Sequence, residues 1–142
     1  MKNQTPIYHP IEMLPTLADL IRGELDGAES HRTDLAEARS RPHSLDDGTL
    51  DRLQSLYRGV LEMTDVYGQQ IERWNDGDPL TDWQRREVDS LALAVKRLRA
   101  CCTEILAMER ELRQGSIDRI LEMSDLEVAQ AVMTGKLKLP GI

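Results

Sequence analysis

Two long stretches of this chain carry apolar residues at alternating spacings of three and four, and this pattern constrains the fold more than any other feature. The first stretch runs from Leu50 to Trp74 and the second from Leu91 to Leu112. Apolar residues at this spacing line one face of an α-helix. No proline interrupts either stretch. The pattern predicts two helices of about 27 and about 33 residues, which are about 40 Å and about 50 Å long.

Capping residues mark both ends of the second long helix. Thr81 and Gln84 have the spacing of a capping box, in which the two side chains bind backbone N–H groups that the first helical turn leaves unpaired. Gly115 is suited to a left-handed C-terminal cap. These signals predict a helix over residues 82–114.

A third long helix is predicted upstream, although its apolar pattern is less regular. Its stripe of Leu, Ile and Ala residues also holds Glu24 and His31. Pro15 is tolerated only in the first helical turn, so the helix is expected to begin near this residue and to run to about Arg39. The prolines before it predict an extended arm over residues 1–10.

Short polar segments separate the long helices, and two shorter helices are predicted after them. Residues 40–47 and 75–80 each contain one Pro and two Asp residues, which is typical of turns between antiparallel neighbouring helices. The C-terminal part predicts helices over Ile117–Met123 and Asp125–Thr134. Gly135 is expected to end the second of them.

The composition agrees with a helical bundle. Aromatic residues make up 4% of the 142-residue chain, which contains no Phe, whereas sheets favour aromatic and β-branched residues. One domain is expected at this length. We predict an all-α, elongated antiparallel up-down-up bundle of three long helices with two short C-terminal helices packed on it. Its parts are the arm over 1–10, the long helices over 11–115, the short helices over 116–135 and a loose tail over 136–142.

Charge and cysteine content exclude several classes of protein. The chain has 18 basic and 25 acidic residues, which give a net charge of −7. Cys101 and Cys102 are adjacent and cannot form a disulfide framework. The longest apolar run, Leu91–Val95, is too short to span a membrane, and residues 1–10 lack the apolar run of a signal peptide. These features predict an acidic cytoplasmic protein with no membrane segment.

Glu24 and His31 lie on the apolar stripe of the helix predicted from near Pro15 to about Arg39, and they are therefore expected to face the other two long helices. Aligning the helix ends places Glu24 opposite Thr64, and it places His31 opposite Tyr57 and Cys101. Polar residues at such positions fix the register of a bundle at a cost in stability. The alternative interpretation is a small buried polar site formed by these side chains.

Two Glu-x-x-Asp pairs leave open a magnesium-dependent enzyme. They are Glu62 with Asp65 and Glu122 with Asp125. All-helical nucleotide pyrophosphohydrolases bind Mg²⁺ through paired carboxylates on neighbouring helices, and Mg²⁺ prefers such oxygen ligands. The predicted helix over residues 82–114 offers no second carboxylate pair opposite Glu62, so this enzyme is the alternative to the main prediction. No phosphate loop or zinc motif predicts another cofactor.

The two short C-terminal helices make a nucleic-acid-associated regulator a third and weaker alternative, because they have the order of a DNA-binding helix-turn-helix. The second helix would present Asp125, Glu127 and Gln130, and no Lys or Arg. Binding to a duplex depends on neutralising phosphates with basic residues. Nucleic acid is therefore not the expected partner.

A second apolar series lies beside the main stripe of the Leu50–Trp74 helix. It consists of Leu56, Gly59, Met63 and Val66. Gly59 would permit close backbone approach, and Met63 is an adaptable contact. Such surfaces are uncommon on soluble monomers, so either the short C-terminal helices or a second subunit is expected to cover this one. The main prediction is a non-enzymatic interaction or scaffold protein, coiled-coil-like and self-associating as a homodimer, without cofactor or catalytic residue.

Overall fold

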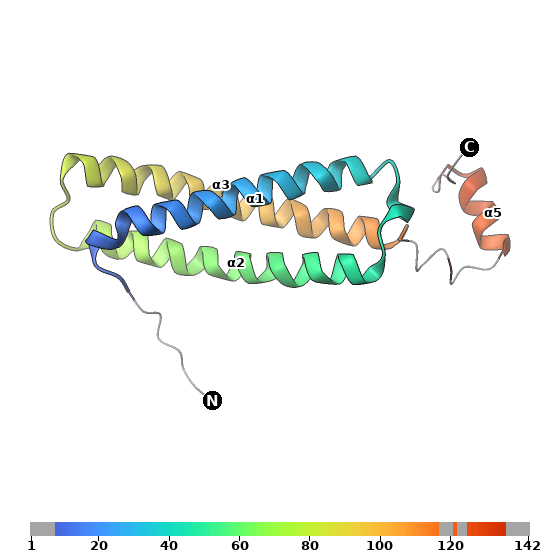
Figure 1. Ribbon diagram of the computed structural model, residues 1–142, viewed down its shortest axis with the longest axis horizontal. Helices are drawn as coiled ribbons and strands as arrows, with labels where there is room; N and C mark the ends of the chain where they lie inside the picture. Colours follow the sequence, from blue (N-terminus) through green and yellow to red (C-terminus); the bar gives the residue numbers. More distant parts are fainter. Residues whose placement is uncertain (1–7, 117–120, 122–124, 136–142) are drawn as a thin grey trace, which may run out of the picture.

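Three long helices run side by side in alternating directions and form an elongated bundle (Figure 1). They are α1 (Leu14–Ala38), α2 (Asp47–Asp76) and α3 (Asp82–Arg113). The computed structural model describes residues 8–116, 121 and 125–135; 85% of these residues are helical and none lies in a strand. The predicted all-α, up-down-up bundle is confirmed.

Side-chain caps fix where α2 and α3 begin. Asp46 Oδ1 accepts a hydrogen bond from the Thr49 amide at 2.7 Å, and this bond lowers the pKa of the Asp46 carboxyl. α2 therefore begins at Asp47, one turn before its apolar stripe. The predicted capping box of α3 is present. Thr81 Oγ1 accepts from the Gln84 amide at 3.2 Å, and Gln84 Oε1 accepts from the Thr81 amide at 2.9 Å.

The segment before α1 lies against the far end of α2. The His9 amide donates to Gln70 Oε1 at 2.6 Å, and the His9 carbonyl accepts from Trp74 Nε1 at 2.9 Å. A 3-10 turn over Ile11–Met13 then leads into α1, which has Pro15 in its first turn as predicted. The part of the predicted arm over residues 1–7 lies outside the described residues.

α3 is the central helix of the bundle, because it packs closely along both α1 and α2. The backbones of α1 and α2 approach each other less closely. Long side chains, including those of Tyr57 and Tyr67, fill the space between these two helices and are buried there. The largest fully buried apolar side chains are Leu14, Ile21, Leu50, Leu91, Leu98, Ile105 and Leu112.

The structure confirms one of the two predicted glycine caps, at Gly135, and not the other, at Gly115. α5 (Asp125–Met133) is followed by Gly135 with a φ of 75°, the left-handed conformation that glycine adopts without steric cost. Gly115 has no positive φ, so the left-handed cap predicted there is wrong. α3 ends instead in a tighter turn, in which the Gly115 amide donates to the Leu112 carbonyl at 3.0 Å.

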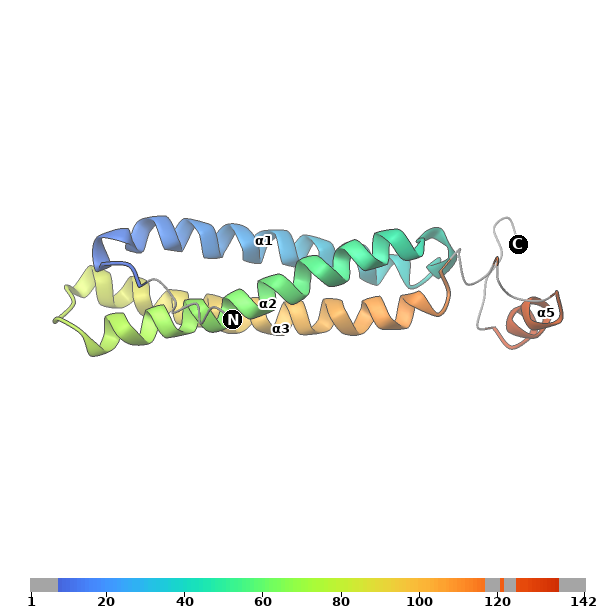
Figure 2. The same cartoon turned by 90° about the horizontal axis from the view of Figure 1, so that it is seen from below.

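α5 lies beyond the end of the bundle at which α2 begins and α3 ends (Figures 1 and 2). Its Leu126 and Met133 side chains are 68% and 86% exposed. The expected packing of this helix on the bundle is therefore not found, because α5 lies past the end of the bundle instead of folding back along α2. The predicted helix Ile117–Met123 and the tail over 136–142 lie outside the described residues. Among the described helices, none has an apolar stretch long enough to cross a bilayer.

Candidate functional site

His31 and Tyr57 form the polar contact between α1 and α2 that the sequence predicts. His31 Nδ1 and the Tyr57 hydroxyl are hydrogen-bonded, and the two rings lie edge to face with their centroids 5.5 Å apart. Burial raises the pKa of Tyr57 to about 12, so the phenol keeps its proton at neutral pH. The contact fixes how the second half of α1 lies against the first half of α2.

Glu24 also reaches α2, but its partner is Tyr67 and not Thr64. The Tyr67 hydroxyl lies 3.0 Å from each carboxylate oxygen of Glu24. Burial and this hydrogen bond both raise the pKa of Tyr67. Thr64 is fully buried and donates to the Leu61 carbonyl of its own helix at 2.6 Å. The predicted pairing of Glu24 with Thr64 is wrong by one helical turn, because the longer tyrosine side chain reaches the carboxylate.

Cys101 and Cys102 are free thiols buried within α3. Burial raises the pKa of both, and that of Cys102 rises to about 11. Nucleophilic attack and metal binding require the thiolate, which a raised pKa disfavours at neutral pH. The surroundings of both residues suit the packing of small apolar side chains.

The predicted polar residues therefore form separate pairs and not one shared site. Glu24 with Tyr67 and His31 with Tyr57 lie about two turns apart along α1, and each pair is hydrogen-bonded internally. Within the described ranges, no group of three His, Cys, Asp or Glu residues is placed to hold a metal ion. Paired in this way, the side chains can fix the register between α1 and α2.

The three described carboxylates of the magnesium alternative, Glu62, Asp65 and Asp125, are not brought together. Asp65 Oδ1 accepts a hydrogen bond from Arg99 of α3 at 2.6 Å. Glu62 is exposed on α2, whereas Asp125 begins α5 beyond the end of the bundle (Figure 1). Glu122 lies outside the described residues. Of the predicted pair Glu62 and Asp65, Asp65 is thus already paired with an arginine.

The second apolar series lies on one face of α2; we call it the α2 surface and define it as Leu56, Gly59, Met63 and Val66. Leu56 and Met63 are 49% and 39% exposed, and Val66 is half-buried. At Gly59, no atom lies within 4 Å of the position that a Cβ would take. The surface faces away from α3, because Asp65, on the other side of α2, pairs with α3. α5 of the same chain does not cover it (Figure 2).

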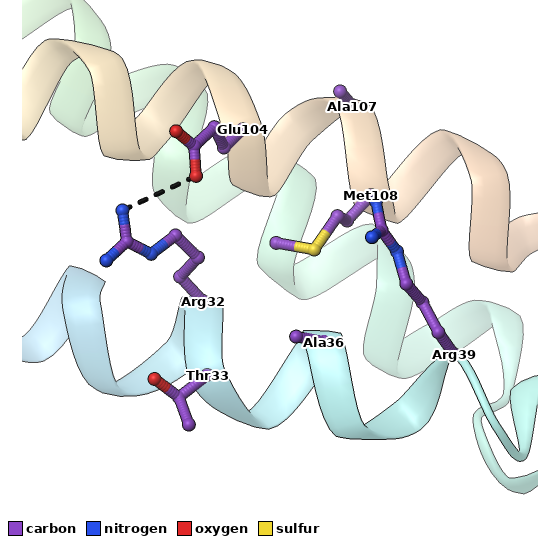
Figure 3. A pocket seen from close by; sticks show the side chains of 7 residues that line it. All are labelled: Arg32, Thr33, Ala36, Arg39, Glu104, Ala107 and Met108. Carbon is purple, nitrogen blue, oxygen red and sulfur yellow. Dashed lines mark hydrogen bonds and ion pairs between the residues drawn. The ribbon is translucent and has the colours of Figure 1, made fainter.

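An open groove of about 500 Å³ lies between α1 and α3, and the sequence interpretation missed it (Figure 3). Small and flexible side chains line it, namely Ala36, Ala107 and Met108. The Arg32 guanidinium crosses the groove and pairs with Glu104 at 3.4 Å (Figure 3). The alanines leave the space open, because neither side chain reaches across to the opposite helix.

Ion pairs between α1 and α3 balance the charge along this groove. At the groove these pairs are Arg32 with Glu104 and Arg39 with Glu111; two further pairs between the helices, Arg22 with Glu87 and Glu29 with Arg97, lie closer to the start of α1. Because each arginine faces a carboxylate, the groove has no excess positive charge that would select an anionic ligand. The sequence signal for the ion pairs at this groove is the seven-residue spacing of Arg32 and Arg39 and the equal spacing of Glu104 and Glu111.

No protein-family model, curated protein or solved structure matches this chain. Its own surfaces are therefore what indicates a function. Among them, the α2 surface is apolar, and the described parts of the chain leave its Leu56 and Met63 exposed.

Proposed function

We propose that this chain is a non-enzymatic interaction protein that self-associates by binding a helix of a second copy along the α2 surface. The observation that carries the proposal is the exposure of Leu56 and Met63, which lie about two turns apart on one face of α2. Contiguous exposed apolar patches on soluble proteins mark interaction sites more often than single exposed residues do.

The spacing within the α2 surface suits a helix as the bound element. Residues three and four apart form one stripe along α2, and a helix with a matching stripe can lie along it. Gly59 lies between Leu56 and Met63 and leaves room for a side chain or a backbone to approach. Met63 adapts its shape to the partner, because its side chain is unbranched and flexible.

The state of the internal polar groups supports a binding role over catalysis. The Tyr57 and Tyr67 hydroxyls have partners within the bundle, and a raised pKa keeps both protonated at neutral pH. The thiols of Cys101 and Cys102 are buried and also have raised pKa values. Each of these groups is better suited to hold the bundle together than to act on a substrate.

Sedimentation velocity over a range of protein concentrations tests the proposal. The wild-type chain should form dimers, and Leu56→Glu should raise the dimer dissociation constant by about a hundredfold, because binding would bury an unpaired charge. Leu93→Glu is the matched control, because Leu93 is an exposed leucine of α3 outside the α2 surface. A wild-type chain that stays monomeric, or equal effects of the two variants, would refute self-association through the α2 surface.

A further inference from the structure

α5 carries an apolar stripe of its own that lies open to solvent. Leu126, Ala129 and Met133 are all exposed, and their spacings of three and four place them on one face of the helix. Exposed apolar side chains on a short helix contribute nothing to its stability. This stripe therefore gains apolar burial only if another surface covers it.

The stripe of α5 has the same spacing and the same order of large and small residues as the α2 surface. In α2 the order is Leu56, Gly59 and Met63, and in α5 it is Leu126, Ala129 and Met133. Each stripe places a small residue between two large flexible ones. Two such stripes fit face to face, because the small residues in the middle let the two helix backbones approach closely.

We propose that α5 of one copy docks on the α2 surface of a second copy, and that the second copy's α5 docks on the first in return. This inference rests on the proposed function and names the helix that the α2 surface binds. α5 lies beyond the end of its own bundle (Figures 1 and 2), and its stripe is exposed there. In the resulting dimer, the α5 stripe and the α2 surface of each chain are both covered by the other chain.

The lengths of α5 and of the α2 surface agree with this exchange, and the exchange doubles the contact between the two chains. The nine-residue α5 is about 14 Å long, and the α2 surface from Leu56 to Val66 is about 15 Å long. A single contact of this length is small beside the area of about 1,200–2,000 Å² that stable interfaces bury. Reciprocal exchange makes the same contact twice around a two-fold axis, which is the common symmetry of homodimers.

The charges favour a parallel orientation of the two helices. Arg52 lies one turn before Leu56 on the same side of α2, and its side chain is exposed. Asp125 lies directly before Leu126 in the first turn of α5. In a parallel arrangement Leu126 lies beside Leu56 and Met133 beside Met63, which brings Asp125 to Arg52. An antiparallel arrangement would place Asp125 at the other end of the α2 surface.

Cross-linking between two differently tagged full-length chains tests the exchange. One chain carries Met63→Cys and the other carries Met133→Cys, and a short bis-maleimide is added to their mixture. We expect a cross-linked heterodimer that forms about tenfold faster than in the control, because docking holds the two thiols at high effective concentration. The control chain carries Arg58→Cys, an exposed position on another side of α2. Unmodified chains give the background from Cys101 and Cys102.

Further combinations separate the ways in which the inference could fail. Fast cross-linking of Leu56→Cys with Met133→Cys, and not of Met63→Cys with Met133→Cys, would overturn the parallel orientation. In the chain that carries both Met63→Cys and Met133→Cys, a product formed only within one chain would show that α5 covers its own α2. If no pair cross-links while Leu56→Glu still dissociates the wild-type dimer, the α2 surface binds something other than α5. If the wild-type chain forms no dimer, the proposed function fails as well.

Discussion

The Tyr67 hydroxyl of α2 lies 3.0 Å from both carboxylate oxygens of Glu24 on α1. The two backbones are too far apart at this interface for small side chains to meet, and a tyrosine bridges the distance. With the contact between His31 and Tyr57, it gives α1 and α2 two fixed points. The register between these helices therefore depends on hydroxyl groups as well as on apolar packing.

Replacing Tyr67 by Phe should lower the free energy of unfolding by about 1–3 kcal/mol, because the partly buried Glu24 carboxylate loses its donor. Glu24→Gln is the conservative partner variant, since its amide oxygen still accepts from the hydroxyl, and it should cost less. Urea unfolding at neutral pH measures both values. A Tyr67→Phe protein as stable as the wild type would show that the bond contributes nothing net to stability.

Alkaline pH should destabilise the bundle through its buried phenols and thiols. The pKa of Tyr57 rises to about 12 in the folded chain and lies near 10 in an unfolded one, so the unfolded state loses its proton first. The contribution of the Tyr57 hydroxyl to the free energy of unfolding is complete below about pH 10 and is lost as the pH rises towards about 12. The buried thiols act with the same sign from a lower pH, since the pKa of Cys102 rises to about 11.

Tyr57→Phe isolates the contribution of the Tyr57 phenol. Its free energy of unfolding should fall less steeply than that of the wild type between about pH 10 and 12. Tyr8→Phe is the control, because Tyr8 lies outside the bundle core and its hydroxyl bonds to Gln69 at the surface. Equal slopes for the wild type and Tyr57→Phe would mean that the Tyr57 hydroxyl ionises as readily in the folded chain as in the unfolded one.

The two thiols should react slowly with a water-soluble disulfide reagent. Both are buried, and a pKa of about 11 leaves little Cys102 thiolate at neutral pH. Absorbance of the released thiol should show full labelling only in urea, whereas Leu93→Cys, at an exposed position of α3 outside the α2 surface, should add one site that reacts at once in the folded protein. Rapid labelling of native Cys101 or Cys102 would mean that this face of α3 opens frequently.

Removing Arg113 should be among the more costly single changes at the end of the bundle. Its guanidinium pairs with Glu109, which is fully buried, and also with the exposed Asp51 at 2.9 Å. Arg113→Met leaves the Glu109 charge buried and should cost about 3 kcal/mol, whereas Asp51→Asn should cost less than about 1 kcal/mol. Denaturant unfolding compares the two. Adding Glu109→Leu to Arg113→Met should restore most of the loss, and a failure to do so would point to packing instead of charge.

The sequence was sufficient for the three long helices but not for every contact between them. Apolar spacing and the Thr81–Gln84 cap located α3, since these signals are local. The partner of Glu24 was misassigned because Thr64 and Tyr67 lie on the same stripe, and aligning helix ends does not resolve one turn. Likewise, the bond between Trp74 and the His9 carbonyl has no sequence signal, since any residue offers a carbonyl.

For a related reason, the sequence predicts the α2 surface but not the groove between α1 and α3. The spacing of Leu56 and Met63 is visible in the sequence, and so the α2 surface was found. Whether α5 covers that surface depends on the path of the chain after α3, which periodicity does not describe. The groove between α1 and α3 is lined by two alanines, Ala36 and Ala107, on separate helices, and periodicity along one helix does not bring such residues together.

The central place of α3 has a consequence for synthesis of the protein. α1 and α2 leave the ribosome first, yet their backbones make few close contacts with each other, and most of their packing is against α3. A nascent chain that ends before Asp82 therefore has two amphipathic helices and no third face on which to bury them. The bundle should form only after translation has passed Arg113, which makes its folding late and nearly all-or-none along the growing chain.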